Sequence, residues 1–345
     1  MNDHDQSYST LTLIAVQRYI FYMMGNMDSQ PRKLISCLEE KEITVTDSPE
    51  MIGRSEGATP RYVVVTPARN EERFISGAIE SVLNQTVLPL KHVIVSDGSN
   101  DSTVSIVESY ATKHSILKLI AVQKEDSSGF GSKALAFNAG WKSLRDFDFD
   151  FLGNLDADVS LPKDYYERMI DAFATDLQLG LASGWIHDTV AGRSVPHMIS
   201  DDSAGGPAQI FRRECLEQIG GYLPLKQGGI DAAAEILARM HGWRTMTIRD
   251  VIVHIRRPIR TGSGNVFGTR FNKGMMNYLL GYHPLFHLGV CFRRLGDRPW
   301  FIGSACLLAG YLSAAMKKPK RQVPPEMVDF LRKEQLHKLR NLFFR

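Results

Sequence analysis

The strongest constraint on the fold is an alternation of short apolar runs with helical patterns between residues 62 and 155. The apolar runs are rich in β-branched residues and predict strands at 62–66, 91–95, 117–122 and 151–155. The segments between them predict helices over 74–83, 102–111 and 133–144. Strands that alternate with helices form βαβ units, so we expect an α/β fold with a doubly wound, mostly parallel sheet.

Polar residues follow the first, second and fourth predicted strands. Pro67 opens the first of these turns, Asp97 opens the second, and Asp156 and Asp158 follow the fourth strand. Sheets of this kind bind ligands at the carboxyl ends of their strands, so we expect one shared crevice. Two carboxylates that flank one residue can both reach Mg²⁺ or Mn²⁺, which in turn bridges nucleotide phosphates. An Asp-x-Asp string alone is also common in solvated turns.

The second half of the chain is less regular. Helices are predicted over 214–219 and 231–240, and one or two strands over 244–255. We expect three parts: an N-terminal extension and linker at 1–59, partly disordered, an α/β domain at 60–256, and a helical, basic C-terminal region at 257–345. The apolar run Leu11–Met24 is too short to span a bilayer, which favours an extension or a short packing helix.

Composition limits the classes of partner and compartment. The 345 residues are 43% hydrophobic and 23% charged, and the net charge of +3 is too small to indicate a nucleic-acid partner. The four cysteines form no C-x-x-C pair, which is typical of reduced thiols in a cytosolic protein. We therefore expect a cytoplasmic protein that binds no nucleic acid.

The C-terminal region contains one apolar segment, Pro299–Met316, which is followed by the string KKPKR. The run is marginally short for a transmembrane span. An apolar segment with an edge tryptophan and flanking cations suits an interfacial segment on anionic lipid, at the inner face of the cell membrane. A helix that packs on the rest of the protein is the alternative.

Four strings, TPARNEE, VSDGSND, GSKALAFNAG and LDADVSLP, occur in this order and together resemble glycosyltransferase family 2. The resemblance covers roughly Arg61 to His254 and implies the glycosyltransferase-A-type fold. It also implies a metal-dependent, inverting transfer from a nucleoside diphosphate sugar, with Mn²⁺ or Mg²⁺ as cofactor. The acceptor would be a glycan or a lipid-linked molecule, in the synthesis of surface polysaccharide or glycoconjugate.

The same resemblance implies a set of donor-binding residues: Pro67, Ala68, Arg69, Glu71, Asp97, Lys133 and Asp156. Asp97 would recognise the nucleoside, Lys133 would neutralise the diphosphate, and Asp156 with Asp158 would hold the metal. Simpler roles stay open for some of them. Asn70 and Glu71 suit the start of a helix, and Lys133 suits a solvated helix surface.

The string QGGIDAAAEILARMHGW resembles the acceptor-side segment of the family, where an acidic residue acts as catalytic base. Asp231 is the predicted base. Many members carry two adjacent acids here, whereas this chain has Ala232 and Ala233 after Asp231. Glu235 is the alternative base, and it could equally pair with Arg239 at i,i+4 spacing.

Residues on both sides of this segment are predicted to complete the site. His254 would be a third metal ligand or a structural histidine. Arg256 and Arg257, with Arg260, would contact the diphosphate or a phosphorylated acceptor, or form a solvated loop. Gly206 and Trp185 would line the acceptor pocket, although Trp185 also suits the core.

Three other classes of protein share some of these features. A nucleotidyltransferase normally has a glycine-rich basic loop after the first strand, which TPARNEE lacks. A Rossmann dehydrogenase is disfavoured because no G-x-G-x-x-G follows any strand. A catalytically silent nucleotide-sugar-binding protein of the same fold remains an alternative, since the second acid beside Asp231 is missing.

Overall fold

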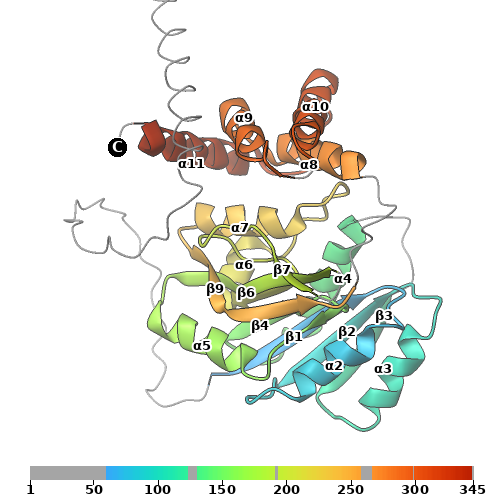
Figure 1. Ribbon diagram of the computed structural model, residues 1–345. Coiled ribbons are helices and arrows are strands. Elements are labelled where there is room, and N and C mark those ends of the chain that lie inside the picture. The colour runs from blue at the N-terminus through green and yellow to red at the C-terminus, as the bar shows by residue number, and fades with distance from the viewer. Residues whose placement is uncertain (1–59, 123–129, 191–192, 258–265, 298, 344–345) are drawn as a thin grey trace, which may run out of the picture. The chain divides into compact units, whose positions relative to one another are not determined.

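A mixed nine-stranded sheet runs through the part of the chain that the structure describes (Figure 1). The computed structural model describes residues 60–122, 130–190, 193–257, 266–297 and 299–343. The predicted extension and linker at 1–59, and Arg260, lie outside these residues. The strand order is β3-β2-β1-β4-β8-β6-β9-β5, with β7 paired to β6. The strands are β1 Tyr62–Ala68, β2 Lys91–Asp97, β3 Leu117–Val122, β4 Phe151–Leu155, β5 Val159–Ser160, β6 Leu179–Val190, β7 Arg193–Pro196, β8 Ala208–Arg212 and β9 Arg244–Ile255.

Helices connect the strands and follow the last of them. They are α2 Ile75–Leu83, α3 Thr103–Ala111, α4 Phe130–Lys142, α5 Tyr165–Thr175, α6 Arg213–Ile219, α7 Ile230–Met240, α8 Val266–Leu280, α9 Pro284–Arg293, α10 Ile302–Lys317 and α11 Pro325–Phe343. None of the described helices is both long enough and apolar enough to cross a membrane.

The four strands predicted from the apolar runs are parallel neighbours. Val65 of β1 pairs with Val93 of β2 on one side and with Asn154 of β4 on the other. The carboxyl ends of β1, β2 and β4 therefore lie side by side. Beyond β4, the antiparallel strand β8 makes the sheet mixed, and β6 and β9 are again parallel. The α/β fold class is confirmed.

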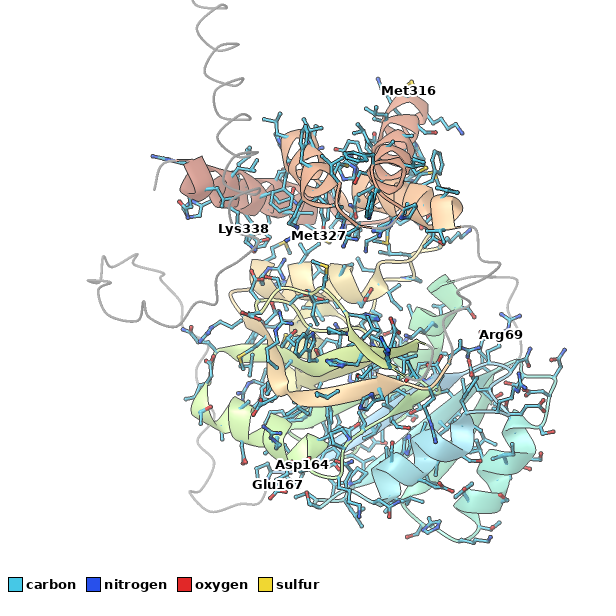
Figure 2. All side chains as sticks on the ribbon, viewed as in Figure 1. Arg69, Asp164, Glu167, Met316, Met327 and Lys338 are labelled. Carbon is cyan, nitrogen blue, oxygen red and sulfur yellow. The ribbon has the colours of Figure 1, made fainter. Side chains whose placement is uncertain are left out.

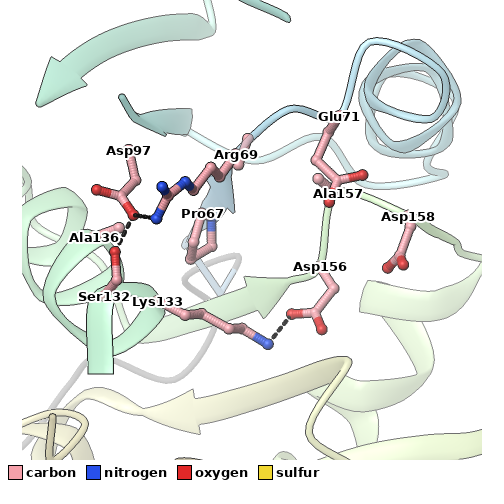
Figure 3. A pocket seen from close by; sticks show the side chains of 11 residues that line it. Pro67, Arg69, Glu71, Asp97, Ser132, Lys133, Ala136, Asp156, Ala157 and Asp158 are labelled. Carbon is pink, nitrogen blue, oxygen red and sulfur yellow. Dashed lines mark hydrogen bonds and ion pairs between the residues drawn. The ribbon is translucent and has the colours of Figure 1, made fainter. Parts of the chain in front are cut away.

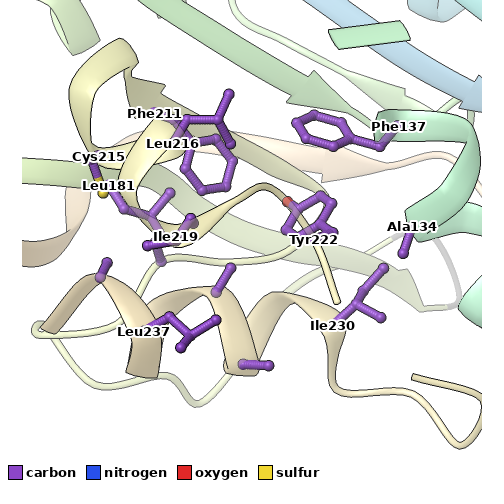
Figure 4. Packing of buried hydrophobic residues seen from close by; sticks show 14 of the residues in the cluster. Ala134, Phe137, Leu181, Phe211, Cys215, Leu216, Ile219, Tyr222, Ile230 and Leu237 are labelled. Atoms are coloured by element: carbon purple, nitrogen blue, oxygen red, sulfur yellow. The ribbon is translucent and has the colours of Figure 1, made fainter. Parts of the chain in front are cut away.

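Helices cover the sheet because its strands are apolar on both faces. Successive side chains of a strand point to opposite faces. Val63 and Val65 belong to the core cluster that contains Phe137 of α4, whereas Tyr62 and Val64 belong to the cluster around Tyr166 of α5. Figure 4 shows the first cluster, where α4, α6 and α7 meet the sheet. Burial on both faces is typical of the parallel part of an α/β sheet.

The C-terminal helices extend the first core cluster. Met276 and Leu280 of α8 and Met327 and Leu331 of α11 are buried in the cluster that also contains residues of α7. The chain from Pro60 to Leu336 accordingly forms one compact unit. The domain boundary at residues 256 and 257 stays a prediction.

Candidate functional site

The turns after β1, β2 and β4 and the first turn of α4 surround a cavity of about 240 Å³ (Figure 3). Its lining residues are Pro67, Ala68, Arg69, Glu71, Asp97, Ser132, Lys133, Ala136, Asp156, Ala157 and Asp158. Every residue predicted to bind the donor nucleotide lies here, together with both aspartates of the predicted metal site. The parallel pairing of the three strands explains why segments far apart in the sequence meet at one sheet edge.

Asn70 ties the turn after β1 to the turn after β2. Its backbone has a positive φ of 56°, which asparagine tolerates better than most residues. Its side-chain oxygen accepts a hydrogen bond from the backbone nitrogen of Asn100 at 2.9 Å, and its own backbone nitrogen donates to Ser99 Oγ at 3.2 Å. The following helix begins at Ile75, so Asn70 fixes a turn and is not the cap of that helix.

Two side chains hold Asp97 in the lining of the cavity. Ser132 Oγ donates a hydrogen bond to Asp97 Oδ2, and an Arg69 guanidinium nitrogen lies 3.8 Å from the same oxygen. Ser132 was not among the predicted site residues. The signal that could have found it is its place between Gly131 and Lys133, in a string that already resembled a binding segment.

Lys133 and Asp156 form an ion pair in the lining of the cavity. Lys133 Nζ lies 2.5 Å from Asp156 Oδ1. Burial raises the pKa of the Asp156 carboxyl, and Lys133 opposes that shift. Burial also disfavours the charged form of Lys133, but the attraction of Asp156 outweighs it, and the pKa of Lys133 is raised. The lysine therefore keeps its charge in the cavity, as the contact with a diphosphate would require.

Arg257 bridges two of the other carboxylates. Its Nε lies 2.7 Å from Asp158 Oδ2, and its terminal nitrogen lies 2.5 Å from Glu71 Oε1. Its guanidinium also stands over the ring of Phe74, 5.1 Å from the centroid. Burial raises the pKa of Glu71, and Arg257 opposes that shift. Arg257 thus contacts two residues of the cavity lining without lining the cavity itself, and its contact with a diphosphate or an acceptor stays a prediction.

Arg256 points elsewhere. Its backbone nitrogen donates to the Asp158 carbonyl at 2.7 Å, but its guanidinium lies against α2, where a Cβ added at Gly77 would come within 1.6 Å of it. Arg256 therefore packs across α2 and does not line the cavity.

The carboxylates suit a divalent cation that takes some of its ligands from the protein and the others from a substrate. Among the described residues, no three His, Cys, Asp or Glu side chains form a group that could hold a metal ion. Asp156 and Asp158 nevertheless supply hard oxygen ligands to the cavity. Mg²⁺ is commonly bound in this way, through one or two carboxylates and the phosphates of a substrate. The residues present fit Mn²⁺ or Mg²⁺ bound together with a nucleotide.

Asp231 lies in the first turn of α7, two residues after Gly229; Gly228 and Gly229 have φ values of 89° and 82°. A Cβ added at Gly206 would lie 2.5 Å from Asp231 Oδ2. The carboxylate of Asp231 also acts electrostatically on Lys133. The structure thus brings two predicted residues, Asp231 and Gly206, together beside the donor cavity.

Glu235 lies one turn further along α7 and is buried. It accepts a hydrogen bond from Ser203 Oγ at 2.7 Å, and an Arg239 nitrogen lies 3.8 Å from it. Burial raises the pKa of Glu235 to about 8, so its carboxyl is mostly protonated at neutral pH. A protonated carboxyl cannot accept a proton, which favours Asp231 as the base.

Trp185 and His254 lie on β6 and β9, outside the lining of the cavity. The Trp185 ring is covered by the guanidinium of Arg249 at 4.7 Å, and its Nε1 donates to the His197 carbonyl at 3.0 Å. The His254 ring lies 6.1 Å from that of His187. A metal role for His254 and an acceptor role for Trp185 stay predictions.

Comparisons with known proteins agree with the fold and the motif order. Residues 63–218 match the model of the family described as glycosyl transferase family 2. A chondroitin synthase of Escherichia coli is 33% identical over 120 residues, which are 35% of this chain and 16% of that protein. A beta-monoglucosyldiacylglycerol synthase of Synechocystis is 24% identical over 193 residues, 55% of this chain and 38% of that protein. The chain thus spans well under half the length of either relative.

Solved structures share the architecture. A mannosyltransferase of Pyrobaculum calidifontis, solved with GDP-Man and Mn²⁺, has a TM-score of 0.53 at 18% identity and covers 97% of both chains. GalNAc-T7, solved with UDP, GalNAc and Mn²⁺, has a TM-score of 0.54 at 13% identity and covers 83% of this chain and 58% of its own. The segment from residue 63 to residue 218 belongs to glycosyl transferase family 2, on a glycosyltransferase-A-type fold.

Proposed function

We propose that the protein is a metal-dependent, inverting glycosyltransferase that moves a sugar from a nucleoside diphosphate sugar to a glycan or a lipid-linked acceptor. One observation carries the proposal: a single cavity collects Asp97, Asp156 and Asp158 from the carboxyl ends of β2 and β4, together with Lys133 of α4. The relatives named for the synthesis of chondroitin and of a glycolipid support an acceptor of this class, in surface polysaccharide or glycoconjugate synthesis.

Several side chains of the cavity have a role in donor binding. Asp97, oriented by Ser132, accepts hydrogen bonds from the nucleoside. Lys133 keeps its positive charge and faces the diphosphate. Asp156 and Asp158 hold Mn²⁺ or Mg²⁺, which supplies positive charge for the leaving diphosphate. The Mn²⁺ in two solved structures of the same fold supports a divalent metal.

Asp231 takes the proton from the acceptor hydroxyl. Direct displacement at the anomeric carbon inverts its configuration and needs one carboxylate beside the donor. Asp231 meets this need, since it stands at the start of α7 and interacts electrostatically with Lys133 and Asp156. Glu235 is mostly protonated at neutral pH because burial raises its pKa to about 8.

We also propose that the protein is cytoplasmic and peripheral on the inner face of the cell membrane. The cations that follow Met316 and the apolar segment before it support this location.

Thermal unfolding with a panel of nucleoside diphosphate sugars, with and without Mn²⁺ or Mg²⁺, tests donor binding. A donor present at one hundred times its Kd adds about 2.7 kcal/mol to the unfolding free energy. We expect a rise of several degrees in the midpoint that needs the metal and disappears in Asp158→Asn. Asp171→Asn, an exposed aspartate on α5, is the matched control.

Turnover tests the chemistry separately. Asp231→Asn should keep the metal-dependent rise in the unfolding midpoint. Its rates of donor hydrolysis and of sugar transfer should fall at least about 100-fold. If no nucleotide sugar raises the midpoint with either metal, the proposal fails. If donors bind but neither wild type nor Asp231→Asn shows turnover with any acceptor class, the protein is a catalytically silent binding protein and not a transferase.

A further inference from the structure

The outer face of α10 is apolar from Ile302 to Met316 and has no partner in the described part of the chain. Between Ile302 and Met316 its exposed residues recur at helical spacing, and all five are apolar: Ile302, Ala305, Ala309, Leu312 and Met316. A helix on the surface of a soluble protein normally has a polar outer face. Figure 2 shows Met316 at the end of α10 that points away from the sheet.

The opposite face of α10 packs on α8 and α9, most extensively on α8. A Cβ added at Gly310 would lie 1.9 Å from the Phe271 carbonyl oxygen, and one added at Gly274 would lie 2.0 Å from the Leu307 carbonyl oxygen. The two helices therefore touch backbone to backbone. α10 cannot rotate to bury its outer face without losing this contact.

Two aromatic residues enlarge the apolar surface at the start of the helix. Trp300 is 60% exposed and Phe301 is 67% exposed, next to Ile302 at 58%. We call the surface formed by Trp300, Phe301 and the five exposed apolar residues of α10 the apolar face. Contiguous exposed apolar surface of this kind marks an interaction site.

Charge identifies the partner. Lys317, Lys318 and Lys320 directly follow the apolar face, are exposed, and have no ion-pair partner among the described residues. The sequence contains no Asp or Glu between Asp297 and Glu326. An apolar surface with an unopposed cluster of cations and an exposed tryptophan matches the interface of an anionic bilayer.

We propose that the apolar face of α10 docks on an anionic lipid surface, with the helix lying flat and the lysine cluster on the headgroups. The inference gives the proposed peripheral location a defined surface and lipid class, and it does not depend on sugar transfer.

The start of α7, which carries the predicted base, is connected to α10 through α8. Gly229, just before Asp231, packs against Met276 and Leu280 of α8. α8 in turn carries α10 on Gly274. Two helices, α8 and α10, therefore stand between the start of α7 and the apolar face.

Vesicle flotation with the full chain tests the proposal. The probes are vesicles of phosphatidylcholine alone and vesicles that also contain phosphatidylglycerol. We expect binding to the anionic vesicles only. A triple serine variant, Ile302→Ser/Leu312→Ser/Met316→Ser, should have a partition coefficient at least about tenfold lower, since each exposed apolar side chain contributes to insertion. Lys317→Gln/Lys318→Gln/Lys320→Gln should lower it about 100-fold, because each cation near the surface contributes about a fivefold factor.

The matched control is Leu88→Ser/Leu177→Ser, which removes two exposed leucines of the α/β part and should bind vesicles like wild type. Thermal unfolding checks that all variants fold. Equal flotation of wild type and both triple variants would overturn the proposal. A second result would also overturn it: wild type is a dimer by light scattering and does not bind vesicles, and the serine variant is a monomer. The apolar face would then bind a second copy. Donor-dependent stabilisation should be unchanged in every variant, so failure here leaves the proposed transferase intact.

Discussion

Gly206 allows the predicted base to approach the backbone of the neighbouring loop. A Cβ at this position would lie 2.5 Å from Asp231 Oδ2, closer than real contacts allow. Gly206→Ala should therefore push the carboxylate away from the acceptor and lower turnover at least about tenfold, since small displacements of catalytic groups are costly. Metal-dependent donor stabilisation should remain, because Gly206 does not line the donor cavity.

Steady-state kinetics and thermal shifts with the donor separate these two effects. Gly296→Ala is the matched control, since a Cβ there meets no atom within 4 Å. Wild-type turnover in Gly206→Ala would show that the carboxylate of Asp231 need not hold its position, which speaks against its role as base.

Glu235 makes the stability of the protein depend on pH. Its pKa is raised by burial from the ordinary 4.5 to about 8, so the folded state holds a proton that the unfolded state releases. The contribution is fully present below pH 4.5, and it is lost as pH rises through about 8, with a slope of at most about 1.4 kcal/mol per pH unit. Glu235→Gln should remove this slope.

Urea unfolding between pH 5 and pH 9 measures the effect. The variant should gain stability over wild type as pH rises, whereas Glu108→Gln, an exposed control on α3, should follow the wild-type profile. Identical pH profiles for wild type and Glu235→Gln would mean that Glu235 is ionised in the folded state.

The elements up to β4 were predictable because local pattern and tertiary environment agree there. The β3 and β4 strands begin and end where the apolar runs predict, at 117–122 and 151–155. Both are short and bounded by turn residues. The three helices of this part differ from the prediction by at most three residues at either end, as helix ends commonly do.

The strands between residues 159 and 212 were not predicted, because long-range pairing decides them. β6 contains Gly180, Gly184 and several polar residues, and its pairing with β9 shifts register twice. β8 is a strand because β4 and β6 lie on either side of it. No prediction covers α5 either, although its buried residues recur at helical spacing. The donor cavity was nevertheless predictable, since it needs only the strand ends that precede this region.

The contact between α8 and α10 depends on glycine. Alanine is intrinsically better than glycine in a helix by about 1 kcal/mol. At Gly310, however, a Cβ would lie 1.9 Å from the Phe271 carbonyl oxygen, and overpacking of this kind costs about 1–3 kcal/mol. Gly310→Ala should therefore lower the unfolding free energy, because the clash outweighs the gain in propensity.

Chemical denaturation compares this variant with Gly303→Ala in the same helix. There the nearest atom to an added Cβ, on Pro299, is 3.5 Å away, which is an ordinary contact, so we expect no loss. A neutral Gly310→Ala would mean that α8 and α10 separate easily.

Across the whole unit from Pro60 to Leu336, the C-terminal helices and the α/β part share one core. Met327 of α11 is fully buried in the cluster that includes Ile236 of α7, and Figure 2 marks it on the inner side of the C-terminal helices. The Arg239 guanidinium of α7 also forms two hydrogen bonds with Glu334 of α11, at 2.8 and 3.2 Å. These contacts predict that both parts unfold together.

Met327→Ala tests this coupling. Truncating a buried methionine costs about 2–5 kcal/mol, and in a cooperative unit that cost lowers the whole transition. Circular dichroism and tryptophan fluorescence should report one midpoint for wild type and one lower midpoint for the variant. Leu336→Ala, on the exposed side of the same helix, should shift the midpoint little. Two transitions, of which Met327→Ala moves only one, would instead show that the chain after residue 256 folds independently, as the predicted boundary implies.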